Sequence, residues 1–147
     1  MTYLEIVNKV LVRLREEQVT SIAENEYSSL ISDLVNVTKN EIENSWNWKV
    51  LRYTYTVTTV DGLFNWALTG SGTRFRVLDA YNATTKSWMY LRPTEWMDEA
   101  FGFSEVITKG PPQNYAFNGV DSAGDSQVDL FPVPDKEYTI RINVVLP

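Results

Sequence analysis

The sequence contains no cysteine and no histidine among its 147 residues. Without cysteine there is no disulfide and no thiolate nucleophile, and without histidine there is no imidazole for acid–base catalysis. Zinc sites of the Cys and His type are excluded as well. No apolar run approaches the ~20 residues of a membrane-spanning helix, and the N-terminus lacks the basic and apolar regions of a signal peptide. Few catalytic groups remain, and we expect neither a membrane partner nor secretion.

Positive charge is also scarce, with 13 Lys and Arg against 19 Asp and Glu and a formal net charge of −6. Such a chain repels the phosphates of nucleic acid, so any contact with DNA should be loose. Aromatic residues, by contrast, make up 13% of the chain, which favours aromatic-rich packing in a core or between subunits. The length is that of one domain, 1–147, which we divide into a helical hairpin (1–48) and a β-rich region (49–147).

Two amphipathic helices are predicted in the N-terminal third of the chain. Thr2 and Glu5 have the spacing of a capping box, and apolar residues three and four apart continue this helix to about Gln18. A longer helix follows from Asn25 to about Trp46. Its apolar face consists of Tyr27, Leu30, Ile31, Leu34, Val35, Val37, Ile42 and Trp46. The short link allows a helical hairpin, although each apolar stripe could instead pack on a different subunit.

From residue 49 onward, alternating side chains are typical of strands. The predicted strands span 49–58, 63–68, 74–81, 87–91, 115–117, 128–131 and 138–144. Asp61-Gly62 suits a tight turn, so we expect the first two strands to pair as a hairpin and the first four to form a meander. Pro93 permits a short helix over 94–101. The predicted fold class is α+β, a helical hairpin packed with an antiparallel β-meander or sheet that carries one short helix.

Two segments could indicate a binding site. The spacing or the context of each segment argues against it. The glycine-rich segment 70–72 could expose backbone amides to an anion, but strands are predicted on both sides of it and no Lys-Ser/Thr pair follows. Asp121, Asp125 and Asp129 do not have the spacing of a calcium-binding loop. We expect a turn and a solvated acidic loop, with no catalytic, cofactor or metal site.

Six large aromatic side chains are the remaining candidates for a site. They are Trp46, Trp48, Trp88, Trp96, Phe101 and Phe103. Flat aromatic rings pack in cores, bury themselves in protein interfaces and stack on sugars or peptides. We favour core packing and then an interface, and we name these six residues as candidates for contact with another subunit or a partner.

Three segments of the sequence resemble the head-to-tail adaptor proteins of short-tailed bacteriophages. These are also called connector, head-completion or tail tubular A-like proteins. The segments are NSWNWKVLR (44–52), GPPQNYAFNG (110–119) and LFPVPDKEY (130–138). Together with the two N-terminal helices, the resemblance covers most of the chain. These segments are structural features of the chain and are not chemical motifs.

The resemblance implies a structural virion protein at the head–tail junction, made in the host cytoplasm. Such proteins assemble as a dodecameric ring beneath the portal protein and dock the tail nozzle or tube protein. The ring extends the channel through which the genome is ejected, so DNA would be non-specific cargo. No cofactor and no enzymatic activity are implied. The family pattern usually continues into further helices after the last strand, so a C-terminal segment beyond Pro147 is also implied.

Two other functions compete with this interpretation. A carbohydrate- or receptor-binding tail module would use exposed aromatic side chains as a platform, and it should show an aromatic cleft open to solvent. A wall hydrolase would need two carboxylates, but adjacent acidic residues such as Asp98 and Glu99 point in different directions on a helix. An adaptor should instead bury its helical hairpin and aromatic loops against identical copies.

Overall fold

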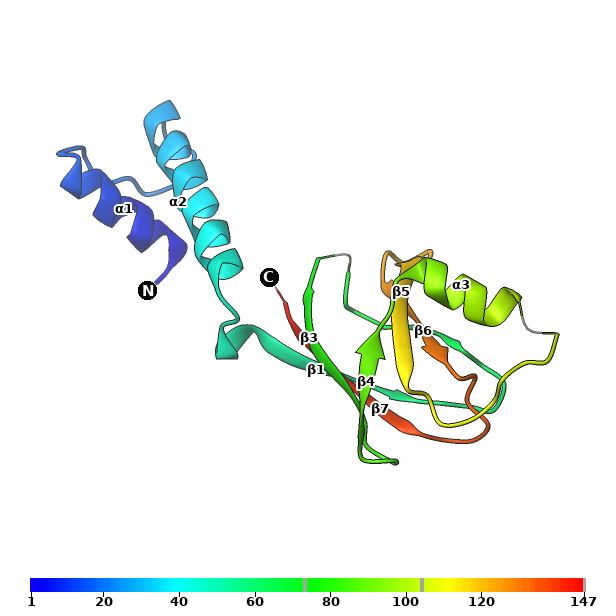
Figure 1. Ribbon diagram of the computed structural model, residues 1–147. Helices are drawn as coiled ribbons and strands as arrows, with labels where there is room; N and C mark the ends of the chain where they lie inside the picture. The colour runs from blue at the N-terminus through cyan, green and yellow to red at the C-terminus, as the bar shows by residue number, and fades with distance from the viewer. Residues whose placement is uncertain (73, 104, 147) are drawn as a thin grey trace. The chain divides into compact units, whose positions relative to one another are not determined.

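A computed structural model describes residues 1–72, 74–103 and 105–146. The chain divides into two units, Met1–Asn47 and Trp48–Pro147, which we call the helical unit and the β-unit. The elements are α1 (Tyr3–Arg13), α2 (Glu26–Ser45), the 3₁₀ helix η1 (Lys49–Leu51), β1 (Arg52–Thr58), β2 (Asn65–Ala67), β3 (Arg76–Asn82), β4 (Ser87–Leu91), α3 (Thr94–Gly102), β5 (Asn114–Val120), β6 (Ser126–Phe131) and β7 (Thr139–Val145) (Figure 1). The predicted α+β class is confirmed.

Both N-terminal helices begin at the predicted positions, each after a capping residue. The Thr2 hydroxyl accepts a hydrogen bond from the Glu5 amide (3.3 Å), and the Glu5 carboxylate accepts one from the Thr2 amide (2.8 Å). At the start of α2, the Asn25 side chain and Ser28 exchange the same pair of bonds. Among the described residues, no helix is both long and apolar enough to span a bilayer.

The first helix ends at Arg13, so the prediction that it reaches Gln18 was wrong. Arg15 adopts a left-handed conformation (φ 63°), its amide bonds to the carbonyl of Val12, and the Glu16 amide bonds to the carbonyl of Leu11. These two bonds are those of a Schellman motif, which satisfies the last carbonyls of a helix and stops it. Glycine usually occupies the left-handed position after a helix. Because arginine occupies it here, the sequence did not indicate that the helix ends at this point.

The helical unit forms the predicted hairpin around a small core of Val7, Leu11, Val19 and Ile31. The side chain of Asn8 accepts a hydrogen bond from the Val19 amide and donates one to its carbonyl (both 2.9 Å). This exchange fixes the link to α1. A core of four buried apolar residues covers only part of the apolar surface that two helices present.

The strands form one seven-stranded sheet in the order β1-β7-β3-β4-β5-β6-β2, antiparallel except between β4 and β5. The predicted hairpin of the first two strands was therefore wrong, and so was the meander of the first four. The turn at Gly62 exists (φ 81°), but its amide bonds to Pro134. β1 pairs along its whole length with β7, and β2 pairs with β6. The turn signal is local and does not specify the partner strand.

The two faces of the sheet differ in character. One face holds the core of the β-unit, which includes Tyr55, Ala80, Met89, Leu130 and Ile142. On the other face, α3 packs against β5 and β6, as Figure 1 shows. Most of the outward side chains of β1, β7, β3 and β4 are exposed or half-buried.

The glycine-rich segment and the acidic loop have structural roles. Residues 70–72 connect β2 to β3, and the hydroxyl of Ser71 accepts a hydrogen bond from the Ser126 amide (3.0 Å). Asp121 accepts bonds from two amides of its own loop, and Asp129 accepts bonds from two asparagine side chains. Within the described residues, no group of three acidic side chains could hold a metal ion.

Candidate protein–protein interface

The second helix exposes most of its apolar face. The predicted face forms, but α1 covers only one edge of it, where Ile31 is buried with Val7 and Leu11. Four neighbouring residues with helical spacing remain 42% to 54% exposed, and we call them the α2 stripe: Tyr27, Leu30, Leu34 and Val37. Large apolar side chains gathered on one side of a helix are characteristic of a surface that another protein covers.

Carboxylates flank this stripe. The charged residues of α2 are Glu26, Asp33, Lys39, Glu41 and Glu43. Lys39 and Glu43 form an ion pair (3.4 Å), whereas the other three carboxylates are exposed and form no ion pair with any residue that the structure describes. At 100° per residue, these three lie on the same side of the helix as the stripe. The α2 stripe is therefore an apolar surface with acidic side chains beside it.

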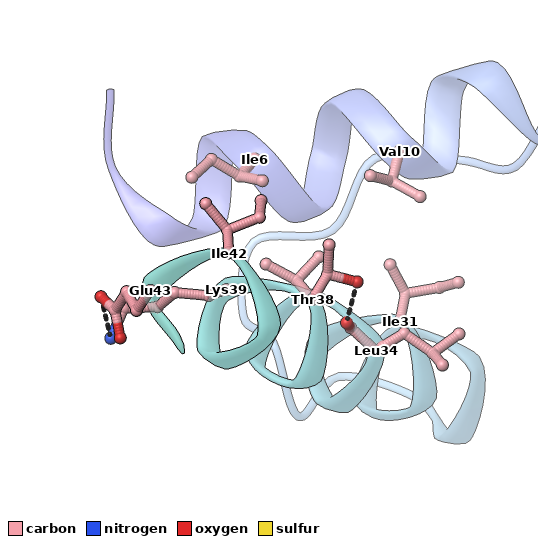
Figure 2. A pocket seen from close by; sticks show the side chains of 9 residues that line it. Ile6, Val10, Ile31, Leu34, Thr38, Lys39, Ile42 and Glu43 are labelled. Atoms are coloured by element: carbon pink, nitrogen blue, oxygen red, sulfur yellow. Dashed lines mark hydrogen bonds and ion pairs between the residues drawn. The ribbon is translucent and has the colours of Figure 1, made fainter. Parts of the chain in front are cut away.

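A groove runs between the two helices beside the stripe. Figure 2 shows Ile6 and Val10 of α1 facing side chains of α2, among them Ile42. The groove has a volume of about 550 Å³ and an almost entirely apolar lining. The Thr38 hydroxyl within it donates to the carbonyl of Leu34 (2.9 Å), so this polar group is already satisfied. The groove and the stripe make a continuous apolar surface, because Leu34 belongs to both.

The structure separates the six predicted aromatic residues into two groups. Trp96 and Phe101 both lie on α3 and pack edge-on against Phe131 of β6, with ring centroids 5.5 Å and 5.4 Å away. Phe101 also contacts Phe64, and the Arg92 guanidinium lies over the Trp96 ring. These contacts attach α3 to the sheet.

The other four predicted aromatic residues are exposed: Trp46, Trp48, Trp88 and Phe103. Trp46 ends α2, Trp48 precedes η1, Trp88 lies in β4 and Phe103 follows α3. They come from separate elements, and of the four only Trp88 lies within a strand of the sheet.

Trp88 belongs to a row of side chains on the outward face of the sheet. Strand register places Thr56 beside Arg141, Arg141 beside Tyr81 and Tyr81 beside Trp88. The rings of Tyr81 and Trp88 meet edge to face, with centroids 5.2 Å apart. Tyr90 follows two residues later on the same face of β4 and is also exposed.

The charge of this face is positive. The four strands β1, β7, β3 and β4 contain three arginines and one acidic residue, Asp79. The Asp79 carboxylate accepts a hydrogen bond from the Asn143 side chain, and Arg52 and Arg141 are exposed. We define the sheet surface as Arg52, Tyr81, Trp88, Tyr90 and Arg141.

Sequence reasoning identified Trp88 but missed the other residues of the sheet surface, as well as the exposure of the α2 stripe. Alternation in each strand already distinguishes inward from outward positions, so Tyr90 and Arg141 could have been assigned to outward faces. Their grouping into one surface depends on the order of the strands, which the sequence does not reveal.

One comparison places the chain in a known protein family. The sequence model described as SU10 adaptor protein matches residues 1–146. No curated protein matches the chain.

Proposed function

The chain belongs to the SU10 adaptor protein family, and from this premise we propose that it is a ring-forming head-to-tail adaptor that joins the portal to the tail and extends the DNA channel. The family consists of phage adaptor proteins, so the chain has a structural role in a virus particle. We propose the ring, its position at the head–tail junction and its partners.

The observation that carries the proposal is the exposed apolar surface of the helical unit. The α2 stripe and the adjoining groove present aliphatic side chains to solvent over much of a 20-residue helix. Burial of apolar surface contributes roughly 25 cal/mol per Å². A partner that covers this surface therefore gains substantial binding free energy. Identical neighbours in a ring, the portal protein and the tail protein are the partners that an adaptor meets.

The net charge of −6 fits a channel wall, because an acidic surface lets DNA slide past without adhering. A dodecameric ring that contacts the portal on one side and the tail nozzle or tube protein on the other would act through surface complementarity alone. We propose no enzymatic activity and no cofactor for it.

A carbohydrate- or receptor-binding tail module receives less support. Such a module needs flat aromatic rings around an open cleft. Aliphatic side chains line the groove between α1 and α2, and two of the six predicted aromatic residues attach α3 to the sheet.

A bridging assay tests the proposal. Portal protein of the same phage is immobilised, and purified tail protein is added with or without this chain. Retention of tail protein only in the presence of this chain supports an adaptor. Equal retention in both cases, or failure of this chain to bind the portal, contradicts it. Binding to a glycan array instead would favour the tail-module alternative.

A further inference from the structure

Contact between neighbouring subunits presupposes the proposed ring. We propose that the α2 stripe of one copy packs against the sheet surface of the next copy. The occupant of the stripe is thus a second copy of this chain, bound through a surface of different composition.

Ring symmetry requires two different surfaces on each subunit. In a closed ring, every subunit contacts its two neighbours through unlike, complementary patches, because a self-complementary patch closes a dimer instead. The chain presents two such patches on its two units. One is helical and apolar with carboxylates beside it, and the other is a sheet face with aromatic and basic side chains.

The charges of the two surfaces are complementary. Glu26, Asp33 and Glu41 flank the stripe and form no ion pair with any described residue. Arg52 and Arg141 on the sheet surface are likewise exposed and have no ion pair within the described part of the chain. Arginine binds carboxylates through a planar fork of donors, which favours specific pairing.

The apolar parts of the two surfaces also match. Tyrosine, tryptophan and arginine are the residues most enriched where interfaces gain their binding energy. Trp88 and Tyr90 offer flat rings to the aliphatic side chains of Leu30, Leu34 and Val37, and both sets are exposed in the single chain. Complementary charge would fix the register of this contact and its partner choice.

Charge reversal on each side gives a test that separates contact between copies from contact within one chain. The basic variant carries Asp33→Lys and Glu41→Lys, so both of its surfaces are positive. The acidic variant carries Arg52→Glu and Arg141→Glu, so both are negative. We expect each variant alone to need more than about tenfold higher concentration to assemble, whether free or on the portal, because like charges now face each other.

Mixing the two variants should restore assembly, since basic and acidic copies can alternate around the ring. Native mass spectrometry should then find both variants in equal amounts. If the stripe instead packs on the sheet of its own chain, mixing restores nothing, whereas combining all four substitutions in one chain does. That result overturns the proposal.

The control variant reverses two exposed charges in the link between the helices, Glu16→Lys and Glu17→Lys, and should assemble like the unaltered protein. If the basic variant assembles as well as this control, the proposed contact is wrong while the ring itself stands. If the unaltered protein forms no ring, either alone or on the portal, the result contradicts both the proposed function and the proposed contact.

The absence of cysteine provides a second, direct readout. Chains with Leu34→Cys are mixed with chains carrying Trp88→Cys in the presence of the portal and treated with a short bismaleimide. The proposed contact predicts a cross-linked heterodimer. Cross-linking at the level seen for a Val12→Cys control, which places the thiol on α1 outside the stripe, would contradict it.

Discussion

The hydroxyl of Tyr3 lies 2.6 Å from the carbonyl oxygen of Ser32 and 2.8 Å from its Oγ. This contact joins the first turn of α1 to the middle of α2, 29 residues later. Because the helical unit has a small buried core, we expect this polar contact to help align the two helices.

Replacing Tyr3 with Phe should weaken the helical unit by about 0.5–1.5 kcal/mol, the usual net value of one hydrogen bond. Urea unfolding followed by the helical circular dichroism signal measures this loss. Tyr27→Phe is the matched control, because Tyr27 is exposed on α2 and should tolerate the change. Equal stability of the two variants would show that the Tyr3 contact does not align the helices.

Replacing leucine with alanine should lower the stability of the protein far more in the core of the β-unit than on its surface. Leu130 on β6 is fully buried, whereas Leu91 on β4 is 58% exposed. Leu130→Ala should lower the free energy of unfolding by about 2–5 kcal/mol, through lost burial and the cavity that remains. Leu91→Ala should change it much less. Denaturant titration of both variants tests this, and similar losses would argue against the assigned core.

Alkaline pH should remove one specific stabilising contact. The hydroxyl of Tyr138 donates to the Asp135 carboxylate (2.6 Å), which raises the pKa of Tyr138 to about 12. Because the folded pKa lies above the unfolded value of about 10, this stabilisation is complete below about pH 10 and is lost as pH rises through about 12. The stability difference between the unaltered protein and Asp135→Ala should shrink over that range. A difference that stays constant would contradict the assignment.

Assembly should depend on the α2 stripe independently of folding. Leu30→Asp with Val37→Asp places charge on the stripe, so the helices should remain folded while ring formation or portal binding is lost. Val12→Asp is the control, since Val12 is similarly exposed on α1. Circular dichroism checks the fold, and light scattering measures assembly. Unchanged assembly in the double variant would show that the stripe is not an interface.

Local chemistry made the starts of the two N-terminal helices predictable. The capping residues Thr2 and Asn25 begin their helices through bonds to side chains and amides only three residues away. The strand over 87–91 was predicted with its observed bounds, because alternation and the preceding turn are also local. Signals of this kind are complete within a short stretch of sequence.

Long-range choices were not predictable in the same way. The turn at Gly62 forms, yet β2 pairs with β6, which lies some sixty residues later. The apolar face of α2 was identified correctly, but only the folded unit shows that α1 is too short to cover it. Among the aromatic candidates, Trp96 lies on α3 and packs against Phe131, whereas Trp88 on β4 is exposed. The sequence alone does not distinguish these two environments.

The central claim is that this chain forms a ring at the head–tail junction, and the most direct measurement is its copy number on the portal. Light scattering gives the mass of the protein alone and after mixing with the portal protein of the same phage, and negative-stain microscopy shows the shape of the complex. The account predicts a ring of many copies, alone or on the portal. A protein that remains monomeric and ignores the portal would contradict it.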